Sequence, residues 1–128
     1  MSDLEKLTIN LSPVDVGRIE LLVSQGFYAN RAEFIRVAIH DKLASHSDVV
    51  REASTRRSMV LGALICDRAK LERARAAGEH LSLRVVGLLD IRPDVPPQLA
   101  LDTIETIAVH GIFRASDAVK KALADRIE

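Results

Sequence analysis

The segment that most constrains this chain is residues 6–11, where apolar and polar side chains alternate along one short stretch. One side is aliphatic and consists of Leu7, Ile9 and Leu11. The other side carries only hydrogen-bonding groups and consists of Lys6, Thr8 and Asn10. Successive side chains of a β-strand point to opposite faces, so this pattern predicts a strand with one buried and one solvent-exposed face.

This strand has no partner nearby in the sequence. Its backbone N–H and C=O groups need hydrogen bonds, and no second strand follows within the roughly two to five residues of a hairpin loop. We therefore expect it to pair with the same strand of a second copy. The sequence predicts a homodimer that presents a polar ribbon to solvent.

Two helices follow the strand, and the first begins with a capping sequence. Ser12 is a preferred N-cap residue, Pro13 suits the first helical position, and Asp15 places a carboxylate near the positive end of the helix. Gly26 is placed to end this helix. Between these ends, apolar residues recur at helical spacing: Val16, Ile19, Leu22 and Val23.

The second helix follows an apolar turn formed by Phe27 and Tyr28. Asn30 is its expected N-cap, and Glu33 stands three residues later, as in a capping box. The inner face of this helix is expected to contain Phe34, Ile35, Ala38, Ile39 and Leu43.

Two runs of residues carry a resemblance to a known family. They are Lys-Leu-Thr-Ile-Asn-Leu-Ser-Pro (6–13) and Gly-Phe-Tyr-Ala-Asn-Arg-Ala-Glu-Phe-Ile-Arg (26–36). Together they resemble ribbon-helix-helix DNA-binding proteins of the CopG/Arc/MetJ type. The resemblance covers residues 5–46 and implies a homodimeric transcriptional regulator. Its antiparallel ribbon would enter the major groove of double-stranded DNA, where each base pair shows a distinct pattern of donors and acceptors.

The resemblance also implies the residues that contact DNA. The base-reading positions of the family fall here on Lys6, Thr8 and Asn10. Lys6 would donate to guanine, Asn10 would contact adenine, and Thr8 would contact a base edge or a thymine methyl. The N-terminus of the second helix would bind a phosphate through its free N–H groups, helped by Asn30 and Arg31. The polar face also fits the solvated side of an edge strand, and this alternative stays open.

The C-terminal half contains an internal repeat. Three Val-x-Gly-x-(Leu/Phe) runs begin at Val60, Val85 and Val109, and their glycines are 25 and 24 residues apart. Each run predicts a strand, and a helix-like or turn-like segment follows each one: 69–77, 96–101 and 116–127. Three strand–helix units of this period resemble a short solenoid of parallel strands with helices outside.

These expectations give an α+β protein in three parts. Residues 1–48 form a ribbon-helix-helix domain for dimerisation and DNA binding, residues 49–57 a linker or helix extension, and residues 58–128 a strand–helix repeat domain. The repeats would bind an effector or protein partner, or join dimers into a higher oligomer, because a parallel solenoid leaves unpaired strand edges at its ends. A small ligand-sensing α+β sandwich is the rival fold for this half.

No cofactor, metal or enzymatic activity is expected. Nickel-responsive ribbon-helix-helix regulators carry a His-x-His strand with a further His and a Cys, whereas here Cys66, His80 and His110 are isolated from one another. The sequence has no glycine-rich phosphate loop and no nucleophile elbow. With one cysteine, a polar start and no apolar run of about 20 residues, the chain is expected in the cytoplasm and not in a membrane.

The distribution of charge leaves other functions open. Residues 1–50 carry five basic and seven acidic side chains, whereas residues 51–80 carry seven basic and four acidic ones. The seven basic side chains would contact DNA backbone or form a solvated helix face: Arg51, Arg56, Arg57, Arg68, Lys70, Arg73 and Arg75. The acidic balance of the first segment is unusual for a strong DNA binder. Alternatives are a structural protein that uses the ribbon-helix-helix unit only to dimerise, or an antitoxin-type autoregulator.

Overall fold

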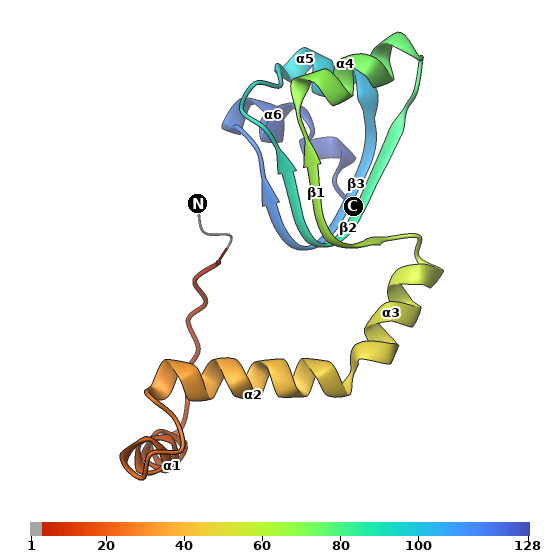
Figure 1. Cartoon of the computed structure of the whole chain (residues 1–128). Coiled ribbons are helices and arrows are strands. Elements are labelled where there is room, and N and C mark those ends of the chain that lie inside the picture. Colours follow the sequence, from red (N-terminus) through yellow and green to blue (C-terminus); the bar gives the residue numbers. More distant parts are fainter. Residues whose placement is uncertain (1–3) are drawn as a thin grey trace. The chain divides into compact units, whose positions relative to one another are not determined.

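The computed structural model describes residues 4–128, which divide into two compact units, one ending at residue 47 and the other covering 48–128. Each unit is described by itself. In chain order the elements are α1 Pro13–Ser24, α2 Arg31–Ser45, α3 Ser47–Arg56, β1 Val60–Cys66, α4 Arg68–Ala76, β2 Leu81–Ile91, α5 Pro97–Thr103, β3 Ile104–Arg114, α6 Asp117–Ala122 and the short 3-10 helix η1 Ala124–Arg126 (Figure 1). None of the helices within residues 4–128 is long and apolar enough to cross a membrane.

The start and end of α1 confirm the predicted caps. Ser12 accepts a hydrogen bond from the backbone N–H of Asp15 at 3.2 Å, and Pro13 is the first helical residue. Gly26 follows the end of the helix with φ +83°, a left-handed conformation that glycine adopts without steric cost. The Asp15 carboxylate lies 3.7 Å from the guanidinium of Arg18.

The start of α2 also has its predicted N-cap. The side-chain oxygen of Asn30 accepts a hydrogen bond from the backbone N–H of Glu33 at 2.8 Å. The Glu33 carboxylate accepts from the backbone N–H of Ala29, one residue before the cap. The preceding turn is held by an edge-to-face contact between Tyr28 and Phe34, whose ring centroids are 4.9 Å apart.

The strand predicted over residues 6–11 is not formed in the single chain. Residues 4–11 are neither helix nor hydrogen-bonded strand. A strand exists only with a partner that accepts and donates its backbone hydrogen bonds, so an isolated copy has nothing to build it against. Pairing with a second copy stays a prediction.

Most of the segment 49–57 lies in a helix of its own. The helix α2 ends at Ser45, because the backbone of its C-cap residue His46 leaves the helical region at φ −110° and ψ 12°, and α3 begins at Ser47. Within α3, the hydroxyl of Ser54 donates to the carbonyl of Val50, and Ser54 is buried.

The repeat in the C-terminal unit forms a three-stranded parallel sheet in the order β1-β2-β3. The three predicted strands are confirmed, although β2 and β3 extend beyond the repeated run at both ends. A helix follows each strand, as the segments 69–77, 96–101 and 116–127 predict. The repeated glycines lie opposite one another across the sheet, Gly62 beside Gly87 and Gly87 beside Gly111.

The core of this unit lies between β2, the central strand, and the helices. One face of β2 is buried and aliphatic: Leu83, Val85, Leu89 and Ile91. Buried residues from α4, α5 and α6 pack into the same cluster: Leu71, Leu99, Ala100 and Val119. Because aromatic residues make up only 3% of the chain, this core is built from aliphatic side chains, as expected.

We predict that the glycine at the centre of the sheet cannot be replaced. A Cβ added to Gly87 would lie 2.1 Å from the carbonyl oxygen of Gly62, and its φ of +134° is one that L-residues rarely adopt. Gly87→Ala should lower the free energy of unfolding by about 3 kcal/mol or more, measured by urea denaturation. The matched control is Gly17→Ala inside α1, where an added Cβ would meet no atom of residues 4–128 within 4 Å apart from the neighbouring backbone of its own helix. That change should stabilise by about 0.5–1 kcal/mol, and equal effects at the two glycines would contradict the packing described.

Candidate nucleic-acid interface

The polar residues of the N-terminal segment are open to solvent. Lys6, Thr8 and Asn10 are all exposed. Within residues 4–128, their side chains make no hydrogen bond and no ion pair. All three therefore keep their full capacity to donate or accept hydrogen bonds with an outside partner, which is what base recognition requires.

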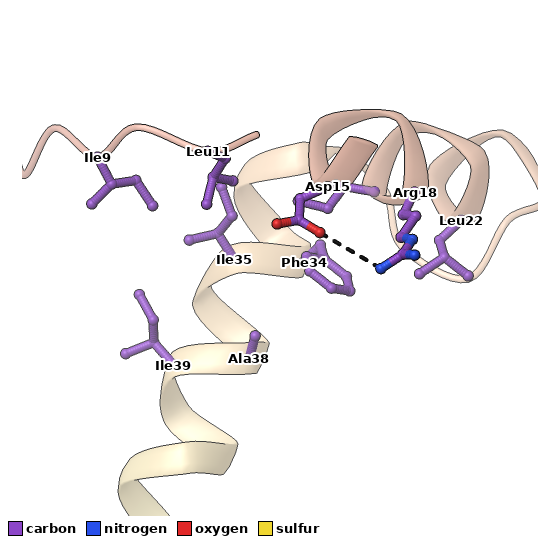
Figure 2. Close-up of a pocket in the computed structure, with 10 residues that line it drawn as sticks. Ile9, Leu11, Asp15, Arg18, Leu22, Phe34, Ile35, Ala38 and Ile39 are labelled. Atoms are coloured by element: carbon purple, nitrogen blue, oxygen red, sulfur yellow. Dashed lines mark ion pairs between the residues drawn. The ribbon is translucent and has the colours of Figure 1, made fainter. Parts of the chain in front are cut away.

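The aliphatic side of the same segment borders an open groove. Ile9 and Leu11 lie at the edge of an apolar cavity of about 360 Å³, opposite Ile35 and Ile39 of α2 (Figure 2). The remaining lining residues come from α1 and α2: Asp15, Arg18, Ile19, Leu22, Phe34 and Ala38. In the single chain Ile9 keeps 57% of its surface exposed, and α2 has no buried residue. A contiguous apolar surface of this kind is typical of a protein–protein interface.

The N-terminus of α2 has unpaired backbone donors. The N–H groups of Arg31 and Ala32 make no hydrogen bond within the described residues. The side-chain oxygen of Asn30 is engaged by Glu33, which leaves its NH₂ group to donate. Free N–H groups at a positive helix end are suited to holding a phosphate.

Arg31 has a partner that sequence reasoning did not find. Its guanidinium lies 3.5 Å from the carboxylate of Glu20 in α1, and both side chains are more than half exposed. A solvent-exposed ion pair contributes little, so this contact would not prevent Arg31 from turning to a phosphate. No local sequence pattern indicates the pair, because the two residues are brought together only by the packing of α1 against α2.

The predicted site residues form two groups. Lys6, Thr8 and Asn10 share one extended segment, and Asn30 and Arg31 share one helix start. Among the described residues, no hydrogen bond or ion pair joins the two groups. All five belong to the N-terminal unit.

The basic side chains of residues 51–75 lie in the C-terminal unit, and several already have acidic partners. Arg51 pairs with Asp48 at 3.7 Å, and Arg68 pairs with Glu72 at 2.9 Å. Arg75 reaches Asp102 of α5 at 3.4 Å. The first two pairs join residues three and four apart on one helix, which is the kind of pair that the solvated-face alternative predicts for this cluster.

Within residues 4–128, no group of three His, Cys, Asp or Glu side chains is placed to hold a metal ion. The side chain of Cys66 is buried in the core of the C-terminal unit. Burial raises the pKa of its thiol above the ordinary value, with Lys70 opposing and the nearby carboxylates of Asp67 and Asp90 reinforcing the shift. Cys66 is therefore an uncharged core residue at neutral pH.

Comparison with known proteins adds one finding to this geometry. A family model described as the ribbon-helix-helix transcriptional regulator family matches residues 2–120. The chain belongs to this family. The match extends beyond residues 5–46, on which the sequence resemblance rests, through most of the C-terminal sheet and helices of this ribbon-helix-helix protein. Searches of curated proteins and of solved structures found no significant match.

Proposed function

We propose that this ribbon-helix-helix protein is a sequence-specific DNA-binding transcriptional regulator that acts in the cytoplasm as a homodimer, without enzymatic activity. One observation carries the proposal. The polar side chains of segment 6–11 make no hydrogen bond or ion pair within residues 4–128, and its aliphatic side borders an open groove. A second copy covering the groove would turn two such segments into one ribbon with a polar outer face.

Dimerisation supplies what the single chain lacks. Antiparallel pairing of the two segments would satisfy their backbone N–H and C=O groups. The aliphatic side chains of residues 6–11 would move from solvent into an interface between two copies. Each large aliphatic side chain that becomes fully buried contributes about 1.5–3 kcal/mol.

The outer face of the ribbon would then read DNA. Lys6, Thr8 and Asn10 of both copies are proposed to contact base edges in the major groove. Asn30, Arg31 and the free N–H groups at the start of α2 are proposed to hold phosphates on either side of the ribbon. Because residues 1–50 carry a net charge of −2, we propose that specific contacts, rather than bulk attraction, dominate the affinity for DNA.

The C-terminal repeats are proposed to form a short solenoid for assembly or for binding an effector or protein partner. The consecutive order of the parallel strands and the helix after each strand support this proposal. The same sheet supports a second candidate function, a structural protein whose repeats are the working surface. In that protein the ribbon-helix-helix unit would only dimerise.

Fluorescence anisotropy with a labelled duplex from the region upstream of the protein's own gene tests the proposal. We expect binding to this duplex to exceed binding to an unrelated duplex and to remain preferential at higher salt. Affinity for both should fall as salt rises, because phosphate contacts release counterions. Equal, weak and salt-erased binding to both duplexes, and to other candidate operators, would favour the structural protein instead.

A further inference from the structure

The three glycines of the sheet form a directional ladder. The carbonyl oxygen of Gly62 lies 2.1 Å from the position where a Cβ of Gly87 would stand. The carbonyl oxygen of Gly87 lies equally close to the corresponding position at Gly111. Each strand thus sends a carbonyl group into a space that the next strand leaves empty by having no side chain.

The ladder has two unoccupied ends. Gly62 in β1 has φ +132°, close to the values of the other two glycines, and apart from Gly62 and its two chain neighbours no atom of residues 4–128 lies within 4 Å of the position of its missing Cβ. Gly111 in β3 has φ +131°, so its carbonyl continues the same series on the outer side of β3. The outer edge of β1 therefore has an empty space beside Gly62, and the outer edge of β3 has a carbonyl group of the kind that fills such a space between the other strands.

The β1 edge has the properties of an interface. All seven residues of β1 are uncharged, and the strand has neither a proline nor a lysine to discourage pairing. Both of its faces carry exposed aliphatic side chains, Val60 on one and Leu61 and Ile65 on the other. Strands of parallel sheets are normally covered, and such an edge readily accepts another strand.

The β3 edge is open over a stretch of matching length. Near its start, Ile127 bridges to Ile107, and the N–H of Glu128 donates to the Ile107 carbonyl at 2.7 Å. Among the described residues, no further strand pairing is found on the outer side of residues 109–113. That stretch has five residues with glycine third, as has the run 60–64 in β1.

We infer that β3 of one copy pairs in parallel with β1 of a second copy, with Gly111 beside Gly62. The pairing extends the register already present between β1 and β2 and between β2 and β3. We assign the partner at the β1 edge to a second copy of this chain, because each chain carries both the open β1 edge and the β3 edge that complements it. The contact is head-to-tail, so it joins dimers into a ring or a filament. This inference rests on the assembly role proposed for the repeats, and not on DNA binding.

The first test measures the association of the full chain by sedimentation velocity across a wide concentration range. Leu61 is 56% exposed at the β1 edge. The substitution Leu61→Lys should weaken association and raise the dissociation constant between dimers at least about tenfold. The matched control is Val49→Lys in α3, at a residue 63% exposed, which should leave association unchanged. A wild-type protein that never exceeds a dimer would overturn the inference.

A charge test separates the interface from the fold. The inferred register places Ile65 beside Arg114 of the second copy, while its neighbour within the same chain is Asp90. Ile65→Glu should therefore associate more tightly than Ile65→Lys. Stability should follow the opposite order, because a glutamate is repelled by Asp90. If both variants change association and stability in the same order, the effect is structural and the register is wrong.

Cross-linking identifies which strands meet. The register pairs Leu61 with His110, so a mixture of Leu61→Cys and His110→Cys proteins should give a dimeric product with a short bis-maleimide reagent. Cys66 is buried and should not react. Cross-linking of Leu61→Cys alone would reveal pairing between two β1 strands and overturn the head-to-tail contact. The operator affinity of Leu61→Lys should be unchanged. That result would show that pairing of β3 with β1 and DNA binding can be tested, and can fail, independently of each other.

Discussion

Replacing Lys6, Thr8 and Asn10 together by alanine should abolish the preference for operator DNA. A dimer presents each side chain twice, and one good bidentate base contact contributes about 1–3 kcal/mol of discrimination. Losing all of them should bring specific affinity down to the non-specific level, a decrease of at least about 10³-fold. Anisotropy titrations of the variant against operator and unrelated duplexes measure both affinities.

The same variant should remain a folded dimer, because these three side chains make no hydrogen bond or ion pair within residues 4–128. Circular dichroism and sedimentation should therefore match the wild type. Lys42→Ala is the control for charge, since Lys42 is exposed near the opposite end of α2. It should weaken binding to both duplexes slightly and equally. A triple variant that still prefers the operator would show that the ribbon does not read the bases.

Ile9→Asp should dissociate the dimer. Ile9 lines the apolar groove and is 57% exposed in the single chain, but it becomes buried if a second copy covers the groove. Truncating a buried isoleucine costs about 2–5 kcal/mol, and burying a carboxylate in its place costs more. With two copies affected, the dissociation constant should rise by at least about 10³-fold.

Sedimentation in the Leu61→Lys background measures this effect without association through the sheet. Leu21→Asp is the matched control, because Leu21 in α1 is also 57% exposed and does not line the groove. It should leave the dimer intact. If both variants dissociate equally, or if neither does, the groove is not the dimer interface.

The sequence by itself determined the local features of this protein. Ser12 and Asn30 begin their helices as predicted, because an N-cap depends on a side chain and backbone N–H groups only three residues away. The glycine period predicted three strands, each followed by a helix, because each unit repeats the same local pattern. Alternation predicted the polar face of Lys6, Thr8 and Asn10, and the resemblance to ribbon-helix-helix proteins implied that these residues contact DNA bases, which remains a prediction.

Only the tertiary structure decided how distant segments meet. The ion pair between Arg31 and Glu20 depends on the packing of two helices, which no local pattern encodes. Residues 6–11 form no hydrogen-bonded strand in one chain, because no other segment of residues 4–128 pairs with them, and pairing with a second copy remains a prediction. The repeat predicted three strands, but the close approach of Gly62 to Gly87 arises from the register between two of them. Such contacts join residues from different helices or strands, so their geometry is determined by three-dimensional packing and not by the local sequence.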